Sequence, residues 1–312
     1  MNVLITGGAG YIGSTLCKYL LDKNFKVTVI DNFIFSYNSL LTYMNHKNFN
    51  VLKIDVRNHT EVNNLAKKFD LIIPLAALVG APLCKLKEKE AIDVNLNSLK
   101  NLVDNLSKDQ ILIYPTTNSG YGIGEKDKFC TEETPLNPIS LYGQTKTNAE
   151  NYISERHENS VRFRLATVFG CSPRMRLDLL VNDFVLKAVK DGYVVLFEAN
   201  FKRNYVHIKD VCSAIIFSIE NFANVKNQTF NLGLSSANLS KLELCNKIKE
   251  YIPNFEISVS EIGTDIDKRD YIVSNNKIET AGFKANVSLD EGIQELKKFY
   301  NFLIPDVSMR NI

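Results

Sequence analysis

The sequence predicts an α/β fold, with a Rossmann-type doubly wound parallel sheet and a smaller C-terminal α/β lobe. Short apolar segments alternate with helical stretches through the first half of the chain, and this rhythm is typical of a parallel sheet covered by helices on both faces. From about Gly170 onward the rhythm becomes irregular, which indicates a smaller lobe built around the ends of the sheet. A chain of 312 residues is long enough for both parts.

The expected strands are near-continuous apolar runs, as strands buried on both faces require. In the first part we expect strands at residues 3–6, 27–30, 51–54, 71–73, 111–114 and 161–165, and a helix at 14–21. In the second part we expect a helix at 179–191, a short strand at 194–197, and helices near 239–251 and 289–302. We expect two parts, residues 1–169 and residues 170–312. Within the second range, residues 203–222 are expected to return to the first part.

Composition narrows the classes of function. A formal net charge of +2 with ordinary apolar content indicates neither a nucleic-acid surface nor an acidic tail. The six cysteines form no CxxC pair and the four histidines are scattered, so we expect reduced packing cysteines and no metal site. The first strand starts directly after residue 2, and no apolar run approaches membrane-spanning length. We therefore expect a cytoplasmic protein without a nucleic-acid or membrane partner.

A glycine-rich segment, TGGAGYIG at 6–13, follows the first strand and opens the first helix. Gly7, Gly10 and Gly13 permit a tight turn and a close backbone approach, and the helix N-terminus offers free N–H groups and a partial positive charge to a pyrophosphate. The spacing is GxxGxxG rather than the commoner GxGxxG, and a glycine-rich turn without a ligand is the alternative. In this strand–turn–helix context the segment favours a dinucleotide site.

Two acidic residues follow strands near this site. Asp31 ends the second strand, where a carboxylate can accept hydrogen bonds from the adenosine ribose hydroxyls and repel a 2′-phosphate. No arginine follows within several residues, so the sequence predicts NAD rather than NADP. Asp55, with Val56, follows the third strand and could hold the adenine, or Asp55 could be the N-cap of the next helix.

Tyr142 and Lys146 are spaced four residues apart, which places them on one face of a helix. A phenol is a poor base at neutral pH, and a neighbouring ammonium stabilises its anion. Thr117, just after the strand at 111–114, offers a hydroxyl for a substrate alcohol, with Thr116 as a competitor. A solvated Tyr/Lys pair and a threonine that bonds only its own loop are the alternatives. The pattern predicts proton removal coupled to hydride transfer.

These motifs, in this order, resemble the extended short-chain dehydrogenase/reductase family, whose members act mostly on nucleoside-diphosphate sugars. The likeness covers nearly the whole chain. It is carried by TGGAGYIG at 6–13, Asp31, LAA at 75–77, Asn95, TTNSGYG at 116–122, YGQTK at 142–146, RNYVHIKDV at 203–211 and FNLG at 230–233.

The resemblance implies a role for each matching residue. Tyr142 would be the catalytic base. Lys146 would stabilise the Tyr142 phenolate and bind the nicotinamide ribose, and the Thr117 hydroxyl would orient the substrate. Residues 1–169 would form the NAD-binding domain and 170–312 the nucleotide-sugar lobe. The expected cofactor residues are Gly7, Gly10, Tyr11, Ile12, Gly13, Asp31, Asn32, Asp55, Val56, Leu75, Ala76, Ala77, Asn95, Tyr142 and Lys146. The expected substrate residues are Thr117, Asn118, Ser119, Thr167, Arg174, Asn182, Arg203 and Arg269, of which Arg203 and Arg269 would clamp the diphosphate. Arg174 and Arg176 could do the same or face solvent.

Missing residues indicate the branch of the family. The dehydratases carry an Asp-Glu pair where this chain has Asn118 and Ser119, and the decarboxylases place a glutamate near Ser119. The branch that epimerises C3 and C5 uses a cysteine there. A 4-epimerase or a 4-dehydrogenase remains, although 4-epimerases often have Asn-Pro where this chain has Thr167-Val168.

The stretch SPRMRLDLLVNDF at 172–184 resembles GDP-manno-heptose 4-dehydrogenases of capsule assembly. We therefore expect oxidation at C4 of a nucleoside-diphosphate sugar for surface polysaccharide synthesis, with a UDP-hexose-type 4-epimerase as the alternative. A non-catalytic dinucleotide-binding protein is a remote alternative, because such relatives typically lose the Tyr or the Lys. A reductase working in the opposite direction would usually take NADPH, which Asp31 disfavours. The resemblance also implies a homodimer formed through the Tyr142 helix and the helix near 97–106.

Overall fold

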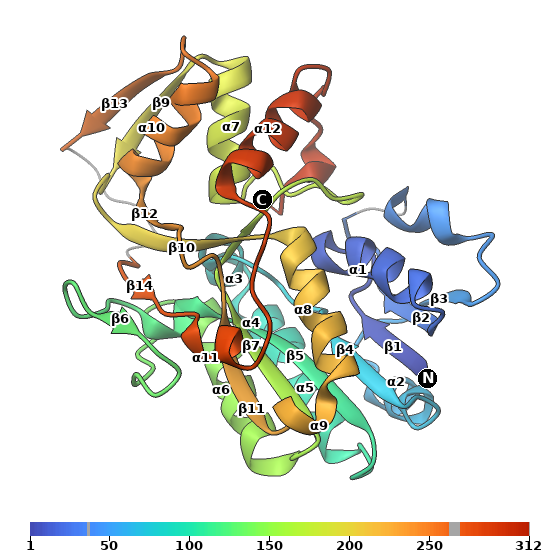
Figure 1. Cartoon of the computed structure of the whole chain (residues 1–312). Coiled ribbons are helices and arrows are strands. Elements are labelled where there is room, and N and C mark those ends of the chain that lie inside the picture. The colour runs from blue at the N-terminus through green and yellow to red at the C-terminus, as the bar shows by residue number, and fades with distance from the viewer. Residues whose placement is uncertain (36–37, 262–268, 312) are drawn as a thin grey trace.

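Seven parallel strands form the central sheet, in the order β11-β7-β5-β4-β1-β2-β3 (Figure 1). The computed structural model describes residues 1–35, 38–261 and 269–311. The sheet strands are β1 (Asn2–Thr6), β2 (Lys26–Asp31), β3 (Phe49–Lys53), β4 (Leu71–Pro74), β5 (Ile111–Thr117), β7 (Ser160–Leu165) and β11 (Gln228–Leu232). The doubly wound parallel sheet and six of its strands are confirmed.

The seventh strand, β11, was not predicted. It pairs in parallel with β7 along its whole length and forms one edge of the main sheet. Three of its five residues, Gln228, Thr229 and Asn231, are polar, so it lacks the continuous apolar run that marks the other strands. The prediction assigned only residues 203–222 of the later chain to the first part. Residues 228–232 also belong there, because they lie in the main sheet.

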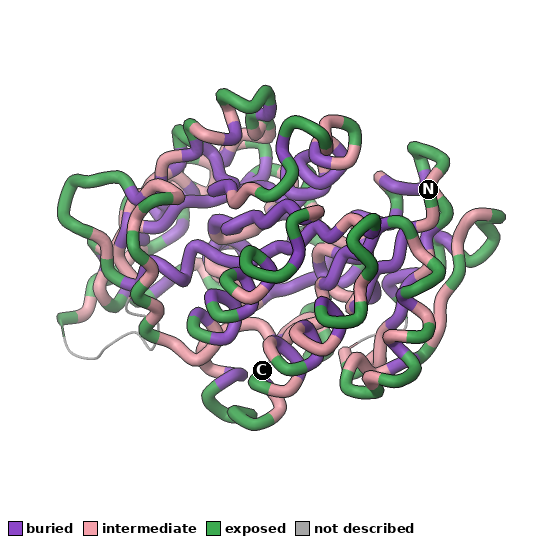
Figure 2. Tube along the Cα trace, turned by 90° about the horizontal axis from the view of Figure 1, so that it is seen from below, coloured by how far each residue is buried: buried purple, intermediate pink, exposed green. Residues whose placement is uncertain are grey.

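Helices cover both faces of this sheet, and the alternation of side chains along β1 shows how. Val3 and Ile5 pack into one apolar cluster with α1 (Tyr11–Asp22) and α8 (Ile208–Glu220), whereas Leu4 packs into another with α5 (Ser98–Asp104) and α6 (Leu141–Arg156). Figure 2 shows this buried centre in purple, with exposed turns around it. Further elements of this part are α2 (His59–Ala66), α3 (Ala81–Leu86), α4 (Glu88–Ile92), α9 (Phe222–Val225) and α11 (Asn276–Thr280).

The smaller lobe contains short sheets and three longer helices. Its helices are α7 (Leu180–Lys190), α10 (Lys241–Tyr251) and α12 (Leu289–Tyr300), close to the predicted ranges, and β9 (Tyr193–Phe197) is the predicted short strand. Ser240 and Ser288 begin α10 and α12 with complete capping boxes. The remaining strands are β6 (Phe129–Cys130), β8 (Thr167–Phe169), β10 (Lys202–His207), β12 (Asn238–Ser240), β13 (Glu256–Ser260) and β14 (Ile272–Val273). No helix in the described ranges is long and apolar enough to cross a membrane.

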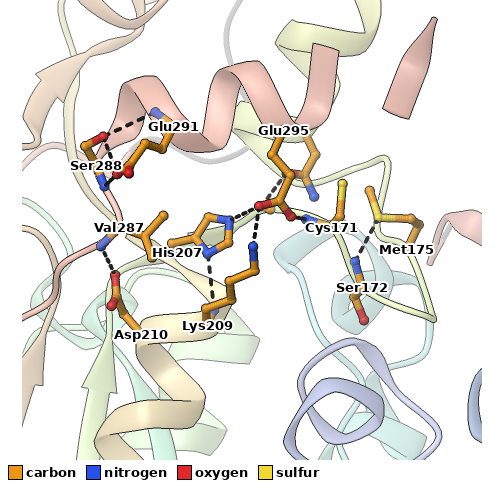
Figure 3. A network of polar contacts seen from close by, with 12 residues as sticks. Cys171, Ser172, Met175, His207, Lys209, Asp210, Val287, Ser288, Glu291 and Glu295 are labelled. Carbon is orange, nitrogen blue, oxygen red and sulfur yellow. Dashed lines mark hydrogen bonds and ion pairs between the residues drawn. The ribbon is translucent and has the colours of Figure 1, made fainter. Parts of the chain in front are cut away.

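A carboxylate on α12 connects the lobe to the start of α8 (Figure 3). Glu295 accepts hydrogen bonds from the Lys209 ammonium (2.7 Å) and the Cys171 backbone N–H (3.1 Å), and His207 Nε2 lies 3.4 Å from its carboxylate. Burial alone would raise the pKa of the Glu295 carboxyl, but His207 and Lys209 outweigh burial and lower it to about 2. The ionised form of Glu295 therefore stabilises the contact between the two parts.

Replacing Glu295 by Gln should lower the free energy of unfolding by about 1–3 kcal/mol near neutral pH, the range for a charged hydrogen bond. Because the native pKa is depressed, this contribution is complete above the unfolded-state pKa of about 4.3 and is lost as the pH falls through the native value of about 2. Urea unfolding followed by circular dichroism at pH 7 and pH 3 should show the difference between wild type and variant shrinking at the lower pH.

The matched control is Glu256→Gln, at an exposed position of β13, which should change the unfolding free energy by less than about 0.5 kcal/mol. Equal effects of the two substitutions at pH 7 would contradict the role given to Glu295.

Candidate active site

A cavity of about 450 Å³ opens at the carboxyl ends of the central strands and reaches into the lobe. This is where ligands bind in open α/β sheets. Nineteen of the predicted site residues line it. They are Gly7, Gly10, Tyr11, Ile12, Gly13, Asp31, Asn32, Val56, Leu75, Ala76, Ala77, Thr117, Ser119, Tyr142, Lys146, Thr167, Arg174, Arg203 and Arg269.

The glycine turn has the shape that a dinucleotide site requires. Gly7 has a φ of +71°, and a Cβ on it would lie 2.5 Å from the Ala76 backbone nitrogen. A Cβ on Gly13 would lie 2.6 Å from the Cα of Gly8, so neither position accepts a side chain. Gly10 is the N-cap of α1 and has no side chain that could occupy the first N–H groups of the helix. These groups can therefore receive the oxygens of a pyrophosphate.

Asp31 ends β2 at the edge of the cavity. Its carboxylate accepts the backbone N–H groups of Ala9 (3.0 Å) and Phe33 (2.8 Å), which fixes its orientation. Burial raises the pKa of Asp31, while these hydrogen bonds and the charge of Arg174 act in the opposite direction. The position is compatible with the expected role as a ligand of the adenosine ribose, and that role stays a prediction.

Asp55 was expected either to hold the adenine or to cap the next helix, and its side chain is placed for neither role. It does not line the cavity, and the N-cap of α2 is Asn58, so the capping alternative is wrong. Hydrogen bonds from Arg57, the largest effect, and from Asn32 outweigh burial and hold the pKa of Asp55 well below its usual range. Val56 lines the cavity in its place.

Three other predicted residues lie behind the cavity wall. Asn95 hydrogen-bonds the backbone of Leu78 through both ends of its amide (2.8 and 2.9 Å), so it braces the loop after β4. Asn182 accepts the Gly170 N–H (3.0 Å) and donates to the Arg176 carbonyl (2.9 Å). Asn118 is 1% exposed, and its side chain has no hydrogen-bond partner among the described residues. Direct contact between these three side chains and a ligand was expected, but the structure does not place them at the cavity.

The three predicted catalytic residues come together in the cavity from two elements. Thr117 ends β5, and Tyr142 and Lys146 lie on one face of α6, which begins at Ser140 with a side-chain cap on the Gly143 N–H (3.1 Å). The Thr117 hydroxyl donates to the Ser119 hydroxyl (2.9 Å) and accepts the Ser119 N–H (3.1 Å).

Thr116, the competing hydroxyl, is oriented toward the Lys146 carbonyl at 3.5 Å. The Thr117 hydroxyl instead begins a chain that continues through Ser119 to Arg269, whose guanidinium donates to the Ser119 hydroxyl. Thr117 is therefore the better placed of the two to share a hydrogen bond with a bound alcohol.

Burial dominates the ionisation of the Tyr/Lys pair. It raises the pKa of Tyr142 to about 12, although Arg269, Arg176 and a hydrogen bond with Thr117 act to lower it. Burial lowers the pKa of Lys146 to about 7, with Glu150 acting in the opposite direction. The Lys146 ammonium lies 3.9 Å from the centroid of the Tyr114 ring, a cation–π contact. The phenol therefore needs further positive charge in the cavity before it can act as a base at neutral pH.

Arginines surround the lobe side of the cavity. Arg203 on β10 is 2% exposed and lies 5.9 Å from the ring of Tyr271, and Arg269 donates to the Tyr271 hydroxyl (3.4 Å). Arg174 and Arg176 are 4% and 6% exposed, so the solvent-facing alternative is wrong for both. Arg176 is neutralised by Asp178 through hydrogen bonds of 2.5–3.0 Å.

Several lining residues were not predicted. Phe35 and the loop at residues 78–83 border the cofactor side, and Asn311 reaches the cavity from the end of the chain. Asn311 Nδ2 donates to the Val79 carbonyl at 3.3 Å. No sequence motif links residues 232 positions apart, so only the folded chain reveals this contact. The described residues contain no group of three or more His, Cys, Asp or Glu side chains arranged to hold a metal.

Replacing Lys146 by Met should stabilise the nucleotide-free protein while it removes activity. A lysine with a depressed native pKa destabilises the fold most below that value of about 7, and this penalty disappears as the pH rises toward the unfolded-state value of about 10.4. At pH 6 we expect the unfolding free energy to rise by about 1–4 kcal/mol, as measured by thermal unfolding. Lys190→Met, at the end of α7 and outside the cavity, should have little effect, and a destabilised Lys146 variant would contradict the expectation.

The chain is similar to known proteins in both sequence and structure. The chain is 26% identical over 312 residues to the low-salt glycan biosynthesis protein Agl12 of Haloferax volcanii, covering 96% of this chain and 98% of that protein. It is 26% identical over 332 residues to the CDP-paratose 2-epimerase of Salmonella typhi, covering 95% and 98%. The crystal structure of UDP-glucuronic acid 4-epimerase from Bacillus cereus, in complex with UDP-glucuronic acid and NAD, superposes with a TM-score of 0.84 at 24% identity, covering 96% and 99%.

The model of the NAD dependent epimerase/dehydratase family matches residues 3–233, which include the glycine turn, Asp31, Thr117, Tyr142 and Lys146. The cavity has a cradle that side chains would block, the Asp31 carboxylate at the end of β2 and a Tyr/Lys pair, so its residues fit the cofactor of this family. This chain therefore belongs to the NAD dependent epimerase/dehydratase family, and its cofactor is NAD.

Proposed function

We propose that this enzyme oxidises C4 of a nucleoside-diphosphate sugar to a ketone. The observation that carries the proposal is the meeting of Thr117, Tyr142 and Lys146 in the same cavity as the glycine turn. When bound, NAD would supply the acceptor for the hydride that leaves C4. The residues of this chain have to bind the sugar, orient its C4 hydroxyl and remove the proton.

The Thr117 hydroxyl and the Tyr142 phenol would hold the C4 hydroxyl between them, with the phenolate taking its proton. Since burial raises the pKa of Tyr142 to about 12, nearby cations must stabilise the phenolate, and Arg269 and Arg176 already act in that direction. Lys146, with its pKa near 7, can add a charge at neutral pH once hydrogen-bond acceptors reach its ammonium. Arg203 and Arg269 are placed to bind the substrate diphosphate as fixed cationic donors.

The net reaction depends on the fate of the ketone. Asn118 and Ser119 replace the acidic pair that a dehydratase would use to eliminate water, which supports simple redox chemistry at C4. Two similar proteins are named as epimerases, one at C2 and the other at C4. The 4-epimerase supports return of the hydride to the other face of the C4 ketone over release of the keto sugar. We therefore propose an epimerase as the leading form of the enzyme and a 4-dehydrogenase as the second.

The more specific substrate predicted from residues 172–184, GDP-manno-heptose, remains a proposal that rests on that stretch alone. The similar proteins named above include a CDP-sugar enzyme and a UDP-sugar enzyme, so their names do not favour one nucleobase for the substrate. We also propose a role in surface polysaccharide synthesis and a cytoplasmic location.

Homodimerisation through α5 and α6 is also a proposal. Light scattering coupled to gel filtration of the purified chain tests it, and a mass of one chain would contradict it.

Replacing Tyr142 by Phe should lower turnover by at least about a thousandfold, because the aromatic ring remains and the proton acceptor is lost. Binding of NAD should be retained, since the hydroxyl is a small part of the cofactor site. The measurement is turnover at saturating substrate together with the NAD content of the purified protein. Tyr152→Phe, on the same helix but outside the cavity, is the control, and its activity should stay within about twofold of wild type. Full activity of Tyr142→Phe would overturn the mechanism.

The substrate and the net reaction can be tested together. The purified protein is denatured to identify the released nucleotide, and fresh protein is then mixed with UDP-, GDP-, CDP- and dTDP-sugars, with GDP-manno-heptose among them. A C4-inverted sugar without lasting absorbance at the NADH wavelength identifies an epimerase. Accumulating NADH with a keto sugar identifies a 4-dehydrogenase, and a product that has lost water would contradict the interpretation of Asn118 and Ser119.

A further inference from the structure

The loop at residues 170–179 leaves the lobe and folds onto the first turn of α1. The Ser172 hydroxyl donates to the Tyr11 carbonyl at 2.7 Å and lies 3.1 Å from the Ser14 hydroxyl. The Tyr11 phenol in turn donates to the Gly170 carbonyl at 2.7 Å. The loop is therefore fixed beside the helix end that receives the cofactor pyrophosphate.

Arg174 extends from this loop toward the segment that follows Asp31. Its guanidinium carbon lies 4.4 Å from the centroid of the Phe35 ring, and the charge of Asp31 acts on it. Both Phe35 and Arg174 line the cavity. Arg174 thus connects the loop that is fixed to α1 with the segment that follows β2.

The charge of Arg174 is buried without a matching carboxylate. The side chain is 4% exposed, and among the residues that the structure describes no carboxylate lies within ion-pair distance of it. Within the described part of the chain it makes one hydrogen bond, from Nη2 to the Arg310 carbonyl at 3.2 Å, and its Nε has no partner there. Burial and the neighbouring Arg176 lower the pKa of Arg174 to about 10, so the group is charged at neutral pH.

A buried guanidinium with unused donors is costly unless an anion binds there. Two diphosphates enter this cavity, one in the cofactor and one in the proposed substrate. Arg203 and Arg269 lie near Tyr271, and Arg269 also contacts Ser119, at the catalytic end. Arg174 instead contacts Phe35, on the segment that follows Asp31, which favours the cofactor diphosphate.

We propose that Arg174 binds the phosphate oxygens of the ADP half of NAD. This assigns to the cofactor a residue that the sequence had placed in the substrate site. The end of the chain supports the arrangement, because Arg310 accepts the Arg174 hydrogen bond, Met309 accepts the Leu177 N–H (2.8 Å), and Asn311 bonds Val79. The ADP half is then enclosed by α1, the Asp31 segment and a loop of the lobe. If the proposed function holds, this enclosure retains the cofactor between the two hydride transfers.

The test is calorimetric titration of protein freed of nucleotide by charcoal. ADP-ribose is the probe for the cofactor site, and UDP, GDP, CDP and dTDP are the probes for the substrate site. Arg174→Met keeps the apolar stem over Phe35 and removes the charge, and should weaken ADP-ribose binding by about tenfold or more. Arg174→Lys should restore part of the loss, and raised salt should weaken ADP-ribose binding more in wild type than in Arg174→Met.

Two controls make the result specific. Arg156→Met, at the end of α6 and outside the cavity, should leave ADP-ribose binding unchanged. Thermal unfolding identifies a variant that fails to fold, in which case Arg174→Gln takes the place of Arg174→Met with the same expectation. The NAD content of each variant after gel filtration is a second readout, and it should fall in Arg174→Met but not in Arg156→Met.

Unchanged ADP-ribose affinity in Arg174→Met would overturn the proposal. If binding of a nucleoside diphosphate weakened instead, Arg174 would belong to the substrate site. These outcomes are independent of the proposed reaction, because ADP-ribose binding requires no nucleotide sugar and no turnover.

Discussion

The close contact between the turn after β1 and the end of β4 determines the rest of the site. Gly7 adopts a positive φ and approaches the Ala76 backbone so closely that a Cβ would lie 2.5 Å from its nitrogen. This contact starts α1 directly at the floor of the cavity, with the first N–H groups of the helix uncapped by any side chain. It also places residues 75–77 along the cavity wall, where Asn95 braces the adjoining backbone from behind.

The electrostatics of the cavity are adapted to anionic ligands. Lys146, Arg174, Arg203 and Arg269 line it, and Arg176 shares it with its partner Asp178. Burial strengthens each interaction with a bound phosphate but also shifts the pKa of Lys146 down and that of Tyr142 up. In the proposed mechanism, Tyr142 and Lys146 therefore reach a useful ionisation only together with charges that the ligands bring, which links binding to chemistry.

Contacts between the lobe and the central sheet determine how the cavity is closed. Glu295 joins α12 to the start of α8, and the loop at 170–179 joins the lobe to α1 through Ser172 and Tyr11. The Asn182 amide holds the same loop by accepting the Gly170 N–H and donating to the Arg176 carbonyl. Although the sequence suggested a ligand contact for Asn182, its amide serves the backbone, since a loop buried between two parts must satisfy its N–H and carbonyl groups.

The sequence by itself determined the features that depend on local pattern. The glycine spacing predicted the turn, continuous apolar runs predicted six sheet strands, and the four-residue spacing of Tyr142 and Lys146 predicted a shared helical face. The tertiary structure alone decided features that depend on contacts between distant segments. Strand β11 is identified by its pairing with β7 because its own residues are largely polar. Arg174 meets Phe35, and Asn311 meets Val79, only because chain segments more than a hundred residues apart pack around one cavity. Such contacts leave no periodicity in the sequence, whereas a turn, a strand or a helical face does.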